Sequence, residues 1–230
     1  WTVTEVATGK SKTSQDLDYT VEGAKTQVEG KNVKPQVVPE IQEWFSDSNA
    51  KLSIDAISSI VYSDASLKAV AEEFKADFKD FTGKDLALEQ GSPKDGAFNF
   101  TLAAPANDAL LGDEGYTMAI GANRIDVQSQ HVTGNMYGMQ TILQMYKLDA
   151  SGFPVGQMRD YPRFEVRGFM WDVARKPVSL DMMKMATRTM RYYKMNDFQA
   201  HLSDNLIFLE DYKTEDAAWK AYAAFRLETS

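Results

Sequence analysis

The sequence contains no cysteine, only two histidines and seven prolines, and no long apolar run. The absence of cysteine excludes disulfide bridges, thiolate metal sites and cysteine nucleophiles. A membrane-spanning helix needs about 20 consecutive apolar residues, and no stretch approaches that length, so we expect no membrane insertion. The histidines and carboxylates form no cluster at ligand spacing, and we therefore expect no metal ion and no cofactor.

Positive charge is also scarce. The sequence has 25 Lys and Arg residues and 33 Asp and Glu residues, which gives a net charge of −8. Nucleic acids and anionic membranes bind through basic patches, so this balance argues against both as partners. Apolar residues are plentiful, at 43% of 230 residues. That content excludes wholesale disorder, and the length suits one large domain or two ordinary ones.

Residues 1–33 are polar and show little periodicity, which predicts a leader or linker with one short strand at Tyr19–Val21. The chain starts at Trp1 rather than at methionine, which indicates a processed or trimmed chain. Residues 34–150 are patterned and predict an α+β domain. Its expected strands are 51–57, 59–62 and 98–103, with a hairpin of 116–120 and 124–128, and its expected helices are 66–81, ended by Gly83, and 134–147.

Residues 151–163 carry two glycines and two prolines, which predicts a linker. The mostly apolar run Phe164–Val173 then predicts a strand buried on both faces. A helix over 180–194 and a strand over 197–202 complete a βα unit of a parallel sheet. Residues 206–212 and a short helical pattern over 215–225 follow.

Ligands of parallel α/β sheets bind at the carboxyl ends of the strands. Asp172 and Arg175 follow the first of the two strands, and His201 and Asp204 follow the second. An arginine can donate to sugar hydroxyls or an anion, and carboxylates accept from hydroxyls, so this set suits a polar ligand. The alternative for Arg175 and Asp204 is a structural ion pair. His131 is expected to be an exposed loop residue.

Several motifs resemble family 20 glycoside hydrolases, the β-N-acetylhexosaminidases and lacto-N-biosidases. The opening of that family's catalytic barrel is similar to Asp160-Tyr161-Pro162-Arg163-Phe164, Arg167-Gly168-Phe169-Met170-Trp171-Asp172-Val173-Ala174-Arg175, Tyr192-Tyr193-Lys194-Met195-Asn196 and His201-Leu202-Ser203-Asp204-Asn205. The domain that precedes the barrel is similar to Pro39-Glu40-Ile41-Gln42-Glu43-Trp44, Thr82-Gly83-Lys84, Gly115-Tyr116 and Gly134-Asn135-Met136-Tyr137-Gly138-Met139-Gln140-Thr141. The resemblance extends from about residue 36 to 205, in the correct order.

The resemblance implies a retaining glycosidase that removes terminal β-linked N-acetylhexosamine or lacto-N-biose from oligosaccharides, with the substrate's own 2-acetamido group as nucleophile. Its partner would be an oligosaccharide or glycoconjugate with a terminal N-acetylhexosamine, met outside or on the surface of a bacterial cell. Arg175 and Asp204 are implied in substrate binding, with Asp172 and His201 in support.

The chain departs from the family pattern in two ways. Gln199 and Asn205 replace a usual histidine and aspartate, and residues 206–225 resemble an insertion, which leans towards the lacto-N-biosidases. A (β/α)8 barrel takes about 250 residues, whereas residues 164–230 number 67. No residue matches the family's catalytic Asp–Glu pair. We therefore expect a truncated barrel over 164–230, no catalytic residue in this chain, and no activity of the fragment alone.

Two other functions stay open at this point. The chain could be a non-catalytic carbohydrate-binding or interaction module, or a small complete α/β enzyme, although two parallel strands cannot supply a self-contained sheet. The strands at 164–173 and 197–202 would have bare edges in a truncated barrel. They are expected to pack on the first domain, to pair with a second copy of the chain, or to be completed by further chain.

Overall fold

A computed structural model describes residues 2–4, 11–13, 28–103, 108–174, 178–202 and 212–222 of the chain. It contains two compact units, unit 1 (Trp1–Arg163) and unit 2 (Phe164–Ser230). The second unit begins at the residue where the sequence predicts the second domain. No helix within the described ranges is long and apolar enough to cross a membrane.

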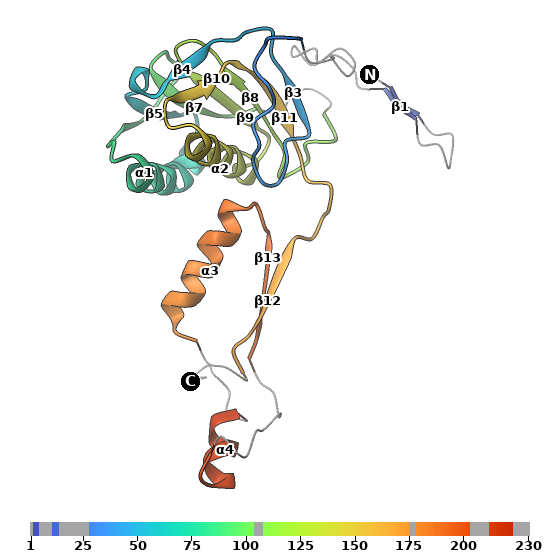
Figure 1. Ribbon diagram of the computed structural model, residues 1–230, viewed down its shortest axis with the longest axis vertical. Coiled ribbons are helices and arrows are strands. Elements are labelled where there is room, and N and C mark those ends of the chain that lie inside the picture. The colour runs from blue at the N-terminus through green and yellow to red at the C-terminus, as the bar shows by residue number, and fades with distance from the viewer. Residues whose placement is uncertain are drawn as a thin grey trace. The chain divides into compact units, whose positions relative to one another are not determined.

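The centre of unit 1 is a mixed sheet of seven strands (Figure 1). In spatial order the strands are β3 (Glu43–Phe45), β11 (Gly156–Asp160), β8 (Tyr116–Ile120), β9 (Ile125–Ser129), β7 (Ala97–Leu102), β5 (Ser59–Tyr62) and β6 (Ala87–Gln90). The pairs β5–β6, β5–β7 and β7–β9 are parallel, and the pairs β8–β9, β8–β11 and β3–β11 are antiparallel. The β8–β9 pair confirms the predicted hairpin.

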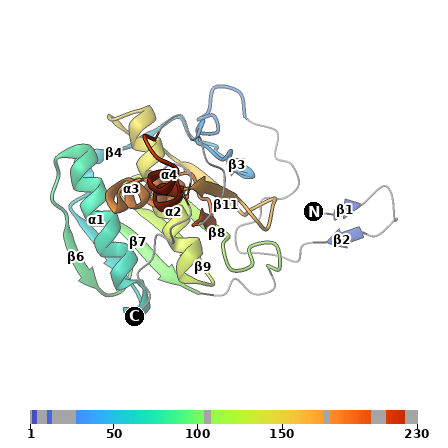
Figure 2. The same ribbon diagram turned by 90° about the horizontal axis from the view of Figure 1, so that it is seen from below.

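Two helices, α1 (Lys68–Thr82) and α2 (Val132–Leu148), pack against each other on one face of this sheet (Figure 1, Figure 2). Both confirm the helices that the apolar periodicity predicts. Gly83 ends α1 in a left-handed conformation with φ of 75°, and its N–H donates to the Lys79 carbonyl at 2.7 Å. A β-carbon at Gly138 would lie 2.6 Å from Val127 Cγ1, so α2 needs glycine there to approach the sheet.

The core between helices and sheet is rich in phenylalanine. Phe74 and Phe78 of α1 are at most 1% exposed and meet Phe98 of β7 edge to face, at centroid distances of 5.6 and 5.2 Å. Phe100 lies 5.3 Å from Phe74 in the same manner. Such edge-to-face pairs add to the free energy gained by burying the rings.

The predicted linker over 151–163 is wrong. This segment forms β10 (Gly152–Pro154), which pairs with β4 (Lys51–Ser53), and β11, which lies inside the seven-stranded sheet. Its glycines reflect packing rather than flexibility, because a β-carbon at Gly156 would come within 2.5 Å of the Trp44 ring. The α+β domain therefore continues past residue 150.

Two smaller predictions for unit 1 also need correction. The expected strand over 51–57 ends at Ser53, whose hydroxyl accepts from Asp55 N and begins the 3-10 helix η1 (Ile54–Ala56). A second 3-10 helix, η2 (Ala65–Leu67), precedes α1. The sequence reading also missed β6.

The predicted leader is partly built into unit 1. Asn32 Nδ2 donates to the carbonyls of Ala50 and Val155 at 2.6 and 3.0 Å, and its own carbonyl accepts from Trp44 Nε1. Farther upstream, β1 (Thr2–Thr4) pairs with β2 (Ser11–Thr13). The strand expected at 19–21 lies outside the described residues.

Unit 2 contains β12 (Gly168–Asp172), α3 (Leu180–Tyr192), β13 (Asp197–His201) and α4 (Glu215–Tyr222). β12 and β13 are parallel, with α3 between them in the chain, which confirms the predicted βα unit. α3 begins at Ser179, whose hydroxyl accepts from Met182 N. Of residues 206–212, only Tyr212 is described.

The expectation that β12 is buried on both faces is wrong for this chain. Phe169 and Met170 are 41% and 54% exposed. In the described part of unit 2, β13 is the single strand neighbour of β12, and these two apolar side chains keep about half of their surface exposed.

Candidate functional site

The carboxyl ends of β12 and β13 place two of the predicted site residues side by side. Asp172 and His201 are register partners in this parallel pair, so they lie at the same edge of the two-stranded sheet. Their side chains are half-buried. Arg175 and Asp204, for which the family resemblance implies substrate binding, lie outside the described residues. The structure therefore places Asp172 and His201 at one edge, whereas their supporting role in sugar binding stays a prediction.

Asp172 also shapes the turn that follows β12. Its Oδ1 accepts from Ala174 N at 3.1 Å, and the N–H groups of Val173 and Ala174 both donate to the His201 carbonyl, each at 3.1 Å. These bonds tie the end of β12 to the end of β13. The turn at Val173 and Ala174 is thus held in a defined position.

The opposite end of the strand pair is held by Asn196. Its Oδ1 accepts from Arg167 N at 2.9 Å, and its Nδ2 donates to the Glu165 carbonyl at 2.8 Å. Arg167 Nε in turn donates to the carbonyl of Lys194, which has a left-handed φ of 56°. These contacts fix the register of β12 against β13, and with it the pairing of Asp172 and His201.

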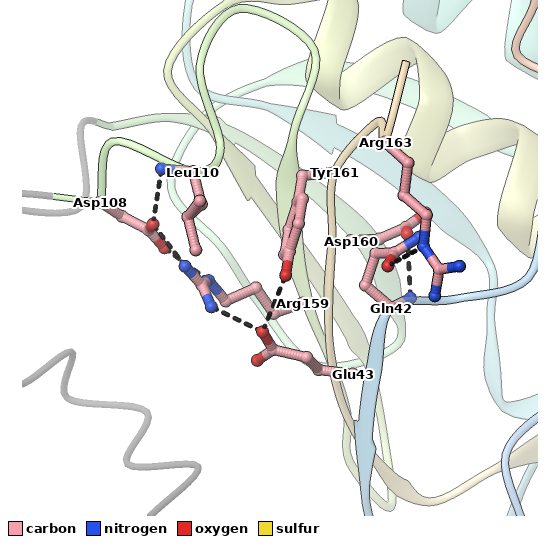
Figure 3. Close-up of polar contacts among 8 residues, drawn as sticks. All are labelled: Gln42, Glu43, Asp108, Leu110, Arg159, Asp160, Tyr161 and Arg163. Carbon is pink, nitrogen blue, oxygen red and sulfur yellow. Dashed lines mark hydrogen bonds and ion pairs between the residues drawn. The ribbon is translucent and has the colours of Figure 1, made fainter. Parts of the chain in front are cut away.

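Unit 1 contains a buried ionic cluster that the sequence reading missed (Figure 3). Arg159 on β11 donates from Nε and Nη2 to both carboxylate oxygens of Asp108, at 2.6 and 2.5 Å, and from Nη1 to Glu43 Oε1 at 2.7 Å. The three side chains are 3–7% exposed. Tyr161 donates to the same Glu43 oxygen at 3.5 Å, while Glu43 Oε2 is buried without a hydrogen-bond partner.

Burial dominates the electrostatics of this cluster. It raises the pKa of Glu43 above its ordinary value, although the charge and hydrogen bond of Arg159 oppose that shift. Burial and the negative charge of Glu43 also raise the pKa of Tyr161. Both carboxylates are committed to Arg159, so we assign the cluster to holding β3, β11 and the loop before β8 together rather than to catalysis.

The residues on either side of this cluster are anchored as well. Asp160 accepts from Tyr116 O–H at 3.0 Å. It also accepts from Gln42 N at 3.2 Å, and Arg163 Nε donates to Gln42 Oε1 at 2.9 Å (Figure 3). The last residues of unit 1 are therefore bound to β3 and its approach. The sequence signal that could have indicated these contacts is the charged pair Arg159-Asp160, which directly follows an apolar residue in a short β-like stretch.

The other predicted features lie away from these contacts. His131 precedes α2 and is 57% exposed, with Nε2 at 3.2 Å from Asp113 Oδ1. The described residues contain no group of three or more histidines or carboxylates arranged to hold a metal ion.

Comparison with known families matches both units. The family model "Glycosyl hydrolase family 20, domain 2" matches residues 34–161, which are 128 of the 230 residues. The model "Glycosyl hydrolase family 20, catalytic domain" matches residues 164–212.

Curated relatives agree with this assignment. A β-hexosaminidase of Porphyromonas gingivalis is 26% identical over 185 residues, which cover 76% of this chain and 22% of the relative. A lacto-N-biosidase of Bifidobacterium bifidum is 26% identical over 189 residues, covering 82% of this chain and 16% of the relative. The chain thus spans about a fifth of the length of these relatives.

Solved structures share the fold. An N-acetyl-β-hexosaminidase of Streptomyces plicatus superposes with a TM-score of 0.63 at 23% identity, covering 76% of this chain and 36% of that one. A chitobiase of Flavobacterium johnsoniae gives 0.62 at 23% identity, with coverage of 74% and 27%. The first family model matches more than half of this chain, and the second matches the residues that follow. This chain therefore belongs to glycosyl hydrolase family 20, and it comprises the N-terminal domain and the start of the catalytic domain of that family.

Proposed function

We propose that this chain is part of an exo-glycosidase that removes terminal β-linked N-acetylhexosamine, or lacto-N-biose, from oligosaccharides. The observation that carries the proposal is the parallel β12–β13 pair, with Asp172 opposite His201, inside the segment that matches the family 20 catalytic domain. Curated relatives named β-hexosaminidase and lacto-N-biosidase support this substrate class. Secretion by a bacterium is part of the same proposal.

In this proposal β12, α3 and β13 are the first βαβ segment of a (β/α)8 barrel. Support comes from the parallel register and from the exposed apolar side chains of Phe169 and Met170, which need a covering layer. The remaining strands and helices of the catalytic domain would provide that layer. Pairing of β12 with a second copy of the chain is the competing way to cover it.

The proposed mechanism is retaining and substrate-assisted. The oxygen of the substrate's 2-acetamido group attacks the anomeric carbon, while a carboxylic acid protonates the departing oxygen. Arg175 and Asp204 would bind the terminal sugar from the edge that Asp172 and His201 define. The Asp–Glu pair that serves the acetamido group and the leaving oxygen is expected downstream, so the 230-residue chain should be inactive alone.

Turnover of p-nitrophenyl N-acetylglucosaminide and p-nitrophenyl lacto-N-bioside tests the proposal. The full-length protein should hydrolyse at least one of them, and the 230-residue chain neither. In the full-length protein, Arg175→Ala should reduce kcat/KM at least tenfold, whereas Arg188→Ala, an exposed arginine on α3, serves as the matched control. Robust turnover by the 230-residue chain would overturn the placement of the catalytic pair.

A further inference from the structure

The face of the seven-stranded sheet that α1 and α2 leave open contains a cavity of about 310 Å³. It lies where β3, the β10–β11 turn and the β8–β9 hairpin come together, and it belongs entirely to unit 1. This volume falls at the lower end of the range typical of small-molecule sites. Its lining includes Phe45, Asp47, Ala119, Arg124, Asp126 and Gln157.

Strand register explains why these side chains gather there. Phe45 on β3 is opposite Gln157 on β11, Gln157 is opposite Ala119 on β8, and Ala119 is opposite Asp126 on β9. Register partners in a sheet project to the same face, so the four form one cross-strand row about 14 Å long. The row has an aromatic end at Phe45 and an acidic end at Asp126. Because the side chain of Ala119 between them is small, the row is hollow near its centre.

The acidic end of the row is rigidly held. Asp126 Oδ1 accepts from Asn99 Nδ2 at 2.8 Å, and Asn99, which is 1% exposed, is itself fixed by two bonds to the Lys94 main chain. Asp126 Oδ2 accepts from Arg124 Nε at 2.9 Å, so the guanidinium is positioned through a buried residue. Arg124 keeps 42% of its side chain exposed beside the cavity. Its Nη1 lies 3.6 Å from the exposed carboxylate of Asp95, and the guanidinium can donate to a ligand from its terminal nitrogens at little conformational cost, because Asp126 already holds it in place.

Within the described residues, the carboxylate of Asp47 and the amide of Gln157 form no hydrogen bond. The cavity thus offers a guanidinium donor, carboxylate acceptors, an amide that does both, and an aromatic ring. With Arg124 positive and Asp47 and Asp126 negative, its formal charge is −1, which disfavours anions. A pyranose meets this combination, because its hydroxyls both donate and accept and its C–H face packs on an aromatic ring.

We infer that this cavity is an accessory binding site for a neutral saccharide, separate in sequence and in structural unit from the β12–β13 edge. The expected ligand is one or two sugar units of the same N-acetylhexosamine-containing glycan, so the ligand class rests on the proposed function. Such a site would hold the glycan by a second point of attachment, which raises the overall affinity through multivalency.

Saturation-transfer NMR on the 230-residue chain tests this inference, with N-acetylglucosamine and its β-1,4-linked dimer as probes. Binding should be detectable at millimolar concentration. Arg124→Met, which keeps an extended apolar stem but removes the donors, and Gln157→Ala should each weaken binding at least threefold. Lys79→Met is the matched control, because Lys79 is similarly exposed and ion-paired, with Asp85, on α1. It should leave binding unchanged.

Binding that survives Arg124→Met and Gln157→Ala but is lost in Arg175→Ala overturns the inference and places the sugar at the β12–β13 edge. Absence of sugar binding to the 230-residue chain also overturns it, and leaves turnover by the full-length protein as the independent test of the proposed function. Unchanged thermal unfolding of both cavity variants shows that any loss of binding is local. If Arg124→Met unfolds, the exposed Gln157→Ala variant decides.

Discussion

Strands β9 in unit 1 and β12 in unit 2 both carry apolar side chains, but these are buried to very different degrees. Ile125 and Val127 of β9 are at most 1% exposed, whereas Phe169 and Met170 of β12 are 41% and 54% exposed. β9 has a strand on each side and α2 against it, whereas β12 has one strand neighbour among the described residues. Apolar side chains of a strand are therefore buried by the elements around it, and under the proposed function the rest of a catalytic domain would cover the exposed side chains of β12.

The largest expected effect compares one phenylalanine from each unit. Phe98→Ala removes a fully buried ring that contacts three other phenylalanines, and should lower the free energy of unfolding of unit 1 by about 3–5 kcal/mol. Phe169→Ala should change the stability of the 230-residue chain by less than about 1 kcal/mol, because that ring is already 41% exposed. Urea denaturation measures both. Equal losses would break the comparison.

The next largest expected change in the free energy of unfolding comes from the ionic cluster of Glu43, Asp108 and Arg159. Arg159→Met leaves the carboxylates of Glu43 and Asp108 buried without their cation, and should cost about 3–5 kcal/mol. Arg163→Met is the control, since Arg163 is exposed and donates to the neutral Gln42, and it should change stability by about 0.5 kcal/mol or less. A mild effect of Arg159→Met in urea denaturation would show that the cluster is not structural.

In unit 2 the corresponding test is Asn196→Ala. It removes the side-chain hydrogen bonds to Arg167 N and the Glu165 carbonyl, and should destabilise the strand pair by about 1–2 kcal/mol. Amide hydrogen exchange should accelerate in β12 and β13 but not in β8 and β9. Asn123→Ala is the matched control, because in the described part of the chain its exposed side chain forms no hydrogen bond. Unchanged exchange in β12 would contradict the assigned role of Asn196.

The smallest expected effect is on the pH dependence of the free energy of unfolding. The pKa of Glu43 is raised in the folded state by burial, so the folded protein binds this proton more tightly than the unfolded chain. Its contribution is therefore most favourable below pH 4.5 and is lost as pH rises through the raised pKa. Glu43→Gln should remove this downward slope in the free energy of unfolding.

Glu40→Gln provides the opposite control for that titration. The pKa of the exposed Glu40 is lowered by its hydrogen bond to Lys34, so its contribution is present above pH 4.5 and is lost as pH falls. Chemical denaturation between pH 3.5 and 7 distinguishes the two variants. An identical pH dependence of Glu43→Gln and the wild type would contradict the raised pKa.

The sequence predicts those elements whose periodicity is uninterrupted. The apolar stripe of α1, the glycine that ends it and the β8–β9 hairpin are all found as expected. Local pattern failed for β11, because Gly156 reads as a breaker although it is required by contact with the Trp44 ring. That contact joins residues far apart in the chain, and no local signal contains it.

The candidate sites likewise differ in whether they could be predicted from the sequence. Asp172 and His201 could be placed together from sequence, because parallel strands bring their carboxyl ends to one edge. The cluster of Glu43, Asp108 and Arg159 and the cavity beside Arg124 could not be foreseen. Both sites depend on which strands are neighbours in the sheet. β11 lies between β3 and β8, and this position is determined by tertiary packing rather than by local sequence.

Amide hydrogen exchange, compared between the 230-residue chain and the full-length protein, tests the central claim most directly. The claim is that unit 1 carries its own core, whereas unit 2 is the opening of a catalytic domain whose remainder covers β12. Amides of β8 and β9 should be equally protected in both proteins, and those of β12 and β13 strongly protected only in the full-length protein. Equal protection of β12 in both would contradict the claim.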